Sequence, residues 1–350
     1  MERGAITLRE IYNQPEVWRQ CLQALDTMDL APLTSGTDPS SHEWIFIGCG
    51  TSYYLAQAAA ASFTDLTGTL ARAVPASEFL LFPHLVVPPE GISFFPVLIS
   101  RSGRTSEVLQ VAEVLKGRAI EFLGITCDGN ELAQLTARII HLPVMEKSTV
   151  MTSSFTSMLL ALQYIAARLA RQDCFVNALR ELPEALANLL PVWGPQVEKF
   201  ARHSFDDVAF LAQGALYPIA SETALKVMES SSSYAQFFHT LEFRHGPKSI
   251  VSEKMLVGAL LSETGYAEES AVLLEMKKLG ACTLAIANRL TPQVSSSADL
   301  AIELALPVPE LARLIVYVVW GQMLGSYVGL RKGLNPDSPR NLSRVVTLAG

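Results

Sequence analysis

The segment SRSGRT, residues 100–105, carries hydroxyl groups at Ser100, Ser102 and Thr105 around one glycine, Gly103. It follows an apolar run at residues 95–99 and precedes a helical pattern, so it lies where a strand passes into a helix. A helix start offers free N–H groups and a partial positive charge, and glycine lets the backbone approach a ligand closely. The segment therefore predicts a phosphate site, with an ordinary Ser/Thr-capped turn as the alternative.

A second set of residues has the types needed for acid–base chemistry. Glu222, Lys226 and Glu229 are spaced by four and three residues, which places them on one face of a helix, and His245 follows in the loop sequence RHGP. An exposed, salt-bridged stripe is the alternative interpretation. The apolar neighbours at positions 224, 225, 227 and 228 instead favour a buried helix whose charged face lines a cavity.

Together these residue types match one reaction class. A carboxylate and an imidazole beside a phosphate loop can open a sugar ring and move a proton between C1 and C2. The chemistry requires no metal ion or cofactor, and we expect neither.

Two repeats of one element pattern are expected to position these residues. Apolar runs that end in a turn and lead into a helix occur at residues 44–47 and 95–99, with further strands at 122–126 and 139–143 and a helix at 152–170. The pattern returns after about 165 residues, with strands at 208–212, 255–261 and 283–287 and helices at 220–230 and 266–279. The sequence thus predicts an α/β fold of two tandem doubly wound, flavodoxin-like domains with parallel sheets, which bind ligands outside the carboxyl ends of their strands.

The expected boundaries divide the chain into five parts. Residues 1–34 form an N-terminal arm or helix, 35–172 the first domain, 173–196 a linker helix, 197–334 the second domain and 335–350 a C-terminal active-site tail. The loop after the first strand, which includes Gly50, Thr51 and Ser52, is the expected partner of the phosphate loop. Tyr53 stands where a dinucleotide fingerprint has its third glycine, so NAD binding is the less favoured interpretation.

Five blocks of sequence resemble a known family. They are CGTS (49–52), SRSGRT (100–105), ETALKVME (222–229), EFRHGP (242–247) and NPDSPRNLSRVVTL (335–348). In this order they resemble the SIS (sugar isomerase) family: the isomerase portion of glucosamine-6-phosphate synthase and the stand-alone amino-sugar-phosphate deaminases and isomerases. The segments FRHGPKS (243–249) and MTSS (151–154) are similar to segments of the galactosamine-6-phosphate deaminase/tagatose-phosphate isomerase-like proteins.

The resemblance implies a role for each matching residue. Ser52, Ser100, Ser102 and Thr105 hold the sugar phosphate, with Gly50, Thr51 and Gly103 in the same loops and Arg101 in place of a glutamine common in the synthases. Glu229 shuttles the proton, His245 assists ring opening from the neighbouring subunit of a homodimer with shared sites, and Glu222 and Lys226 orient the open chain. Thr152 and the tail residues Ser343 and Arg344 complete the expected substrate contacts.

Two departures from the synthases narrow the expected reaction. The chain has no glutaminase domain and no cysteine next to its start, so we expect no glutamine hydrolysis. Arg344 stands where the synthases have an imine-forming lysine and cannot act as an amine nucleophile, so an electrostatic clamp is expected there. The leading hypothesis is conversion of a hexosamine 6-phosphate to a ketose 6-phosphate and ammonia. A ketose/aldose isomerase or a fructosamine-6-phosphate deglycase is the alternative, and a non-catalytic sugar-phosphate sensor is the second alternative.

Composition limits the other possibilities. The 350-residue chain has a net charge of −7 and scattered Lys and Arg residues, which disfavours nucleic acid as a partner. Five widely spaced cysteines without CxxC pairs indicate thiols of a reducing compartment, so a cytoplasmic location is expected. The apolar stretch at 314–330 contains glycines and a glutamine, which favours a buried or interface helix over a membrane span.

Overall fold

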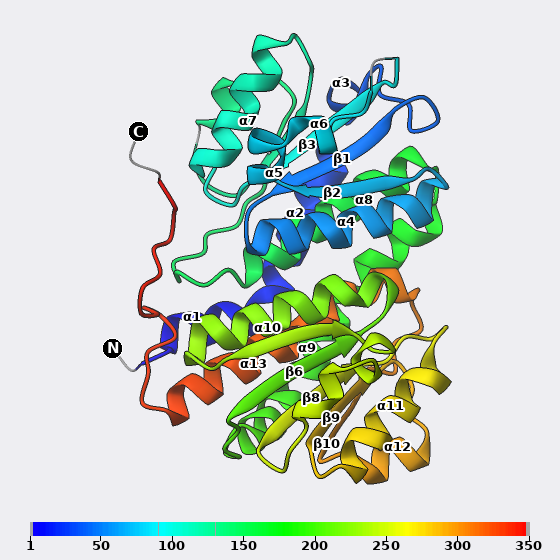
Figure 1. The fold of residues 1–350 in the computed structure, drawn as a ribbon. Coiled ribbons are helices and arrows are strands. Elements are labelled where there is room, and N and C mark those ends of the chain that lie inside the picture. The colour runs from blue at the N-terminus through cyan, green and yellow to red at the C-terminus, as the bar shows by residue number, and fades with distance from the viewer. Residues whose placement is uncertain (1–2, 90, 130, 348–350) are drawn as a thin grey trace. The chain divides into compact units, whose positions relative to one another are not determined.

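The structure is a computed structural model that describes residues 3–89, 91–129 and 131–347. The chain forms two compact units, each built around one five-stranded parallel sheet (Figure 1). The first-sheet unit contains Glu16–Glu146, Ser153–Arg180 and Ser343–Gly350. The second-sheet unit contains Met1–Pro15, Lys147–Thr152 and Glu181–Leu342. The last three residues of the predicted tail, 348–350, lie outside the described part of the chain.

The first sheet has the strand order β2-β1-β3-β4-β5, which is the flavodoxin-like order. Its strands are β1 (Glu43–Gly48), β2 (Ala71–Pro75), β3 (Phe94–Ile99), β4 (Leu123–Thr126) and β5 (Ile139–His141). The helices of this part of the chain are α2 (Gln14–Thr27), α3 (Ala31–Thr34), α4 (Thr51–Thr67), α5 (Ala76–Leu81), α6 (Pro83–Val86), α7 (Ser106–Gly117), the 3₁₀ turn η1 (Leu132–Gln134) and α8 (Ser153–Leu169).

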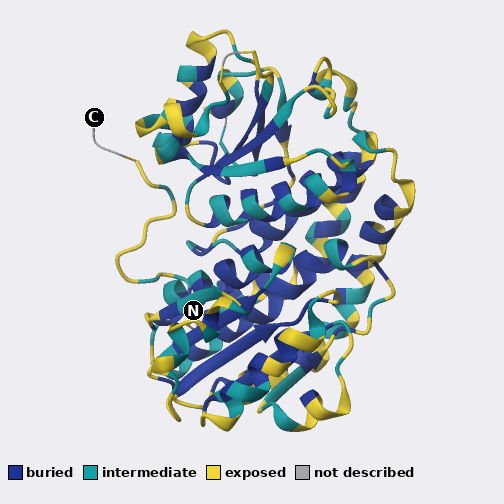
Figure 2. Cartoon of the chain, turned by 45° about the vertical axis from the view of Figure 1, so that its right-hand side comes forward, coloured by how far each residue is buried: buried dark blue, intermediate teal, exposed yellow. Residues whose placement is uncertain are grey.

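Apolar side chains point alternately to the two faces of the sheet along β1, which explains why helices cover both faces. Trp44 and Phe46 point to the face covered by α4, where the Trp44 ring stacks on Phe63 at 4.5 Å. Ile45 and Ile47 belong to the cluster on the opposite face, with residues of α5 and α7. A strand that is apolar at every position is expected for a sheet buried on both sides, and Figure 2 shows buried strands in each unit.

The second sheet repeats the topology with the order β10-β9-β8-β6-β7. Its strands are β6 (Asp207–Ala212), β7 (Ala235–His239), β8 (Met255–Leu260), β9 (Cys282–Ala287) and β10 (Leu300–Glu303). The remaining elements are α1 (Ala5–Tyr12), α9 (Asp173–Phe200), η2 (Gly214–Leu216), α10 (Tyr217–Ser231), η3 (Glu242–Arg244), η4 (Pro247–Ile250), α11 (Tyr266–Lys278), α12 (Pro292–Ser297) and α13 (Glu310–Arg331). The expected α/β fold with two flavodoxin-like parallel sheets is thus confirmed.

Helix α13 packs tightly against α10 through three glycines spaced four residues apart. A Cβ atom on Gly325 would lie 2.6 Å from the carbonyl oxygen of Lys226, and one on Gly329 would lie 2.1 Å from that of Ser230. Glycine is therefore required where the backbones of the two helices meet. Helix α13 is long and apolar enough to span a membrane, but 89% of its most apolar 18-residue window is buried, as in the core helix of a globular domain.

Residues 4–7 and residues 335–337 meet in the second-sheet unit. Helix α1 has no side-chain cap of its own, and the carboxylate of Asp337 accepts hydrogen bonds from the N–H groups of Ile6 and Thr7 at 3.3 and 2.8 Å. The side chain of Asn335 accepts another from the N–H of Gly4 at 2.9 Å. These bonds supply the acceptors that the start of a helix lacks and fix residues 335–337.

Candidate active site

The loops predicted to hold phosphate leave two neighbouring strands at the same edge of the first sheet. Strand β1 pairs in parallel with β2 on one side and with β3 on the other. The chain therefore reverses its direction of travel across the sheet between β1 and β3. This is the topological switch point of the sheet, where open α/β sheets bind ligands. Gly50 and the buried residues Thr51 and Ser52 begin α4 there, and residues 100–105 join β3 to α7.

The loop at residues 100–105 brings its hydroxyl groups together. The Ser100 and Thr105 hydroxyls are hydrogen-bonded at 3.0 Å, and Ser102 Oγ accepts from the N–H of Arg104 at 3.1 Å. Gly103 has φ +63°, and a Cβ there would lie 3.0 Å from the Asp128 carbonyl oxygen, so both conformation and space require glycine. Thr105 occupies the N-cap position of α7 without making a side-chain cap. The Ser/Thr-capped turn does not account for its hydroxyl.

Arg101 of this loop is buried and lies against the carboxylate of Glu146, which was not among the predicted site residues. Its Nη1 lies 3.0 Å from Oε2 of Glu146, and the two side chains are 6% and 1% exposed. Glu146 also accepts hydrogen bonds from the hydroxyls of Ser153 and Ser154, at 3.1 and 2.5 Å, at the start of α8. A buried carboxylate remains charged at low cost only when it is surrounded by donors in this way.

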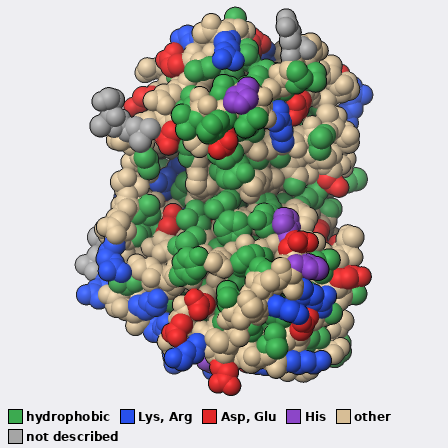
Figure 3. All heavy atoms as spheres, viewed as in Figure 1, with side chains coloured by type: hydrophobic (Ala, Val, Ile, Leu, Met, Phe, Trp, Pro, Cys, Tyr) green, Lys and Arg blue, Asp and Glu red, His purple; other side chains and the backbone are tan. Residues whose placement is uncertain are grey.

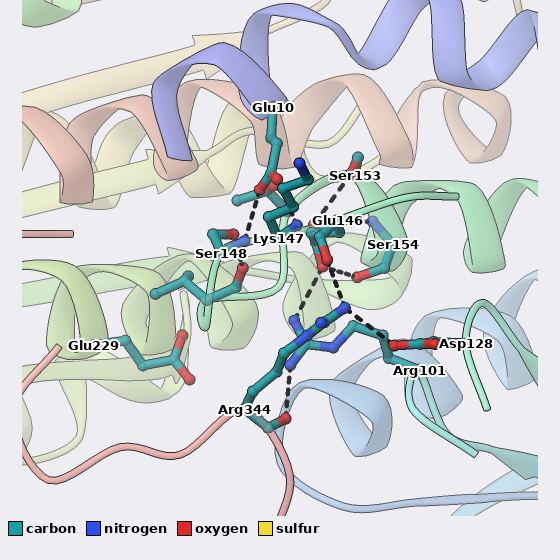
Figure 4. Close-up of polar contacts among 12 residues, drawn as sticks. Glu10, Arg101, Asp128, Glu146, Lys147, Ser148, Ser153, Ser154, Glu229 and Arg344 are labelled. Atoms are coloured by element: carbon teal, nitrogen blue, oxygen red, sulfur yellow. Dashed lines mark hydrogen bonds and ion pairs between the residues drawn. The ribbon is translucent and has the colours of Figure 1, made fainter. Parts of the chain in front are cut away.

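The C-terminal tail crosses the same edge of the first-sheet unit (Figure 4). Arg101 Nη2 donates to the carbonyl oxygen of Arg344 at 2.8 Å, and Arg344 Nη2 donates to the carbonyl oxygen of Glu146 at 2.5 Å. The Arg344 guanidinium also lies 3.2 Å from Asp128, in a pair whose side chains are 40% and 48% exposed. Ser343 is exposed, and its hydroxyl donates within the tail to the carbonyl oxygen of Val345.

The corresponding loop of the second sheet has different chemistry. After β8, the N–H and hydroxyl of Ser262 donate to the carboxylate of Glu269 at 2.6 and 2.8 Å. The N–H of Glu263 donates to Glu310 at 2.6 Å. Two carboxylates of the protein therefore occupy donors that an anion would need in this loop.

Helix α10 carries the predicted acid–base residues as one ion triad in the second-sheet unit. Lys226 Nζ lies 3.2 Å from Glu222 Oε1 and 2.5 Å from Glu229 Oε2. The side chains of Glu222 and Lys226 are 0% and 1% exposed, whereas that of Glu229 is 16% exposed. The alternative of an exposed stripe is therefore wrong, and Glu229 is the most accessible of the three.

The triad keeps its lysine charged. Burial by itself lowers the pKa of Lys226, but the carboxylates of Glu222 and Glu229 outweigh it and raise that pKa above its ordinary value. Both carboxylates have Lys226 as a partner, which offsets part of the cost of burying these charges.

His245 lies in a surface loop between η3 and η4 that a second carboxylate holds in place. Glu275 of α11 accepts from Lys248 Nζ at 3.0 Å and from Arg244 Nε at 2.8 Å, on either side of the histidine. The hydrogen bonds from Lys248 and Arg244 lower the pKa of Glu275. His245 itself is exposed, and Gly246 beside it has φ +128°.

The structure places the predicted site residues in both units. The first-sheet unit brings together Arg101 of the phosphate loop and Arg344 of the tail. The second-sheet unit contains Thr152, whose carbonyl oxygen accepts from Gln322 at 3.2 Å, together with the ion triad and His245. Glu146, Asp128 and Glu275 were missed. The only sequence signal for Glu146 was a lone carboxylate between the last strand of the repeat and a hydroxyl-rich helix start.

Charged side chains of both signs are intermixed on the surface shown in Figure 3, and the described residues contain no cluster of metal ligands. On the face in Figure 3, Lys and Arg side chains lie among Asp and Glu side chains. Among the residues that the structure describes, no group of three His, Cys, Asp or Glu side chains is arranged to hold a metal ion.

The chain matches the model of a known protein family and is similar in sequence and in structure to known proteins. The family model described as SIS domain matches residues 40–168 and 204–319. The glutamine–fructose-6-phosphate aminotransferases (isomerizing) of Synechocystis and Chlamydia pneumoniae are 28% and 29% identical over 97% and 99% of this chain. The chain spans 59% of the length of each.

Two solved structures resemble the chain over nearly its whole length. The glucosamine-6-phosphate deaminase of Thermotoga maritima has a TM-score of 0.80 at 28% identity, covering 98% of this chain and 100% of that one. The tagatose-6-phosphate ketose/aldose isomerase of Escherichia coli has a TM-score of 0.83 at 23% identity, covering 96% and 95%. Because the identity to the isomerase is only 23%, this likeness shows a shared fold alone.

Proposed function

This chain belongs to the SIS domain family. We propose that it is an enzyme that converts a hexosamine 6-phosphate into a ketose 6-phosphate and ammonia. The similarity to a glucosamine-6-phosphate deaminase at 28% identity, with 98% and 100% of the two chains covered, supports this choice. The similarity to isomerizing aminotransferases supports the same substrate class.

The exposure of Glu229 is the observation that carries the proposal. A proton shuttle must meet the substrate and also be held in a charged state. Glu222 and Lys226 are 0% and 1% exposed and paired with each other. Glu229 is 16% exposed and keeps its contact with Lys226. It is the member of the triad that suits contact with a sugar.

The proposed reaction begins with the open-chain amino aldose. Glu229 removes the proton from C2 and returns it to C1, while O1 gains a proton and the amine nitrogen loses one, so the aldehyde is converted to an alcohol and the C2 amine to an imine. Water then adds to C2, and the carbon–nitrogen bond breaks to give the ketose and ammonia. Glu229 ends the cycle deprotonated, and Lys226 stabilises that state.

The phosphate is assigned to the loop of the first sheet. Ser100, Ser102 and Thr105 offer hydroxyls beside a helix start, and Ser52 and the backbone of Gly50 lie at the neighbouring strand end. Arg344 is the clamp for the negative charge. The second-sheet loop is not assigned a phosphate, because Glu269 and Glu310 already occupy its donors.

We assign ring opening to His245, acting from the partner subunit of a homodimer. Its exposed position in a loop fixed by Glu275 is consistent with contact to a second chain. All five cysteines are free thiols, which is typical of a reducing compartment, and we place the reaction in the cytoplasm.

A substrate panel tests the proposal and separates its alternatives. The purified protein is incubated with glucosamine 6-phosphate, galactosamine 6-phosphate, tagatose 6-phosphate and a fructosamine 6-phosphate conjugate. Ammonia release with ketose formation supports the deaminase. Release of an amino acid from the conjugate, or interconversion of sugars without ammonia, identifies a deglycase or an isomerase instead. Binding without turnover of any compound identifies a sensor.

A further inference from the structure

Glu146 is a buried carboxylate that joins three segments of the first-sheet unit. It is 3% exposed and receives donors from Arg101, Ser153 and Ser154. Arg101 belongs to the phosphate loop, and the two serines begin α8. The third segment is the C-terminal tail, whose Arg344 side chain donates a hydrogen bond to the carbonyl oxygen of Glu146 (Figure 4).

Arg101 is hydrogen-bonded both to Glu146 and to the C-terminal tail. One nitrogen of its guanidinium bonds the Glu146 carboxylate at 3.0 Å, and the other bonds the Arg344 carbonyl oxygen at 2.8 Å. Because the guanidinium is planar and rigid, fixing one nitrogen fixes the direction of the other. The orientation imposed by Glu146 therefore determines whether Arg101 can hold the tail.

The described part of the tail is an exposed segment without regular secondary structure. Residues 343–347 form no helix or strand, and four of the five are exposed. Besides the bonds of Arg101 and Arg344, the N–H of Ser106 at the start of α7 donates to the carbonyl oxygen of Val346 at 3.3 Å. An exposed segment outside helices and strands opens readily once a contact that holds it is lost.

We propose that Glu146 is a positioning residue that couples the phosphate loop to the C-terminal tail through Arg101. The charge of Arg101 is compensated by Glu146, so Arg101 docks the tail and leaves Arg344, in an exposed pair with Asp128, as the cation for the substrate. The tail docking stands on the contacts above, and only the link to catalysis rests on the proposed function.

Hydrogen–deuterium exchange on the full chain tests the docking without a substrate. Glu146→Gln keeps the shape of the side chain and removes its charge. The reporter is the N–H of Ser106, which donates to the carbonyl oxygen of Val346 in the tail. Its exchange, called tail exchange below, is expected to accelerate at least about tenfold, the factor that corresponds to one lost charge-assisted hydrogen bond. Arg101→Gln, which removes the bond to the tail directly, is expected to accelerate tail exchange in the same way and serves if Glu146→Gln does not fold.

The matched control is Glu269→Gln. Glu269 is equally buried and also receives a backbone N–H and a hydroxyl in a loop after a strand, but it lies in the second-sheet unit. Its loss is expected to leave tail exchange unchanged. The proposal is overturned if tail exchange in both Glu146→Gln and Arg101→Gln equals that of the unsubstituted protein, or if Glu269→Gln releases the tail as strongly.

A kinetic measurement then examines the link to catalysis. In Glu146→Gln, KM for the hexosamine 6-phosphate is expected to rise about tenfold with kcat changed less than about threefold, because phosphate binding is weakened and the base is untouched. A fall in kcat at unchanged KM contradicts the coupling. If the unsubstituted protein turns over no hexosamine phosphate, the proposed function fails while the exchange experiment still decides the positioning role.

Discussion

Replacing Glu222 and Glu229 separately by glutamine distinguishes the folding role of the ion triad from its chemical role. Glu222 and its partner Lys226 are 0% and 1% exposed, and removal of one partner of a buried pair costs about 3–5 kcal/mol. Since Lys226 keeps Glu229, we expect the lower end, about 3 kcal/mol. At roughly 2–4 °C per kcal/mol for a cooperative unit of this size, Glu222→Gln lowers Tm by about 6–12 °C.

Glu229→Gln is expected to behave in the opposite way. Its side chain is 16% exposed, and the loss of a charged hydrogen bond there costs about 1.5 kcal/mol. The base is lost, however, so kcat falls by about 10²–10⁴-fold while substrate still binds. Incorporation of solvent deuterium at C1 or C2 falls in parallel.

Thermal melts, steady-state kinetics and isotope exchange on both variants measure these effects. Glu16→Gln is the control, because its pair with Arg19 on α2 is 50% and 42% exposed and should affect neither Tm nor kcat. The reasoning is refuted if Glu229→Gln turns over at the normal rate, or if Glu222→Gln loses turnover with no change in Tm. The second result would make Glu222 the base.

The other predictions concern the loop, the dimer and pH. Ser102→Ala with Thr105→Ala should raise KM for the phosphorylated sugar about tenfold or more, because charge-assisted hydrogen bonds are lost; unchanged binding of phosphate ligands in calorimetry would exclude this loop. Mixing inactive His245→Ala and Glu229→Ala chains should restore part of the activity, and exchanged heterodimers that stay inactive would contradict a shared site. The lowered pKa of Glu275 means that its stabilisation of the histidine loop is complete above the ordinary value of 4.5 and is lost as pH falls through the lowered pKa. The protection of residues 242–250 against hydrogen exchange, taken relative to the intrinsic exchange rate at each pH, should therefore fall in acid, and Glu275→Gln should remove that pH dependence.

Much of the architecture was predictable because it depends on local patterns. Apolar runs identified β1, β3, β4, β5, β6, β8 and β9, and glycine-containing turns follow the runs of β1, β3, β6 and β8. The repetition of this pattern identified two doubly wound sheets. The strands that were missed, β2, β7 and β10, are the edge strands at both sides of the second sheet and one side of the first. Such strands are covered less completely than central ones, so their sequences have a weaker apolar signal.

The spacing of Glu222, Lys226 and Glu229 by itself determined that they share a helix face, because the α-helical period is a local property. Only the tertiary structure decided that two of them are buried and one is partly accessible, since burial depends on α13, whose glycines bring it against α10 from about 100 residues away in sequence.

The same division holds for the phosphate loop. Its hydroxyls, its glycine and its place between a strand and a helix were evident from residues 100–105 alone. The charge of Arg101 is compensated by Glu146, 45 residues away, and its second nitrogen binds the tail, 243 residues away. Hydrogen-bond partners of this kind follow from the packing of whole elements, and no periodicity in the sequence records them.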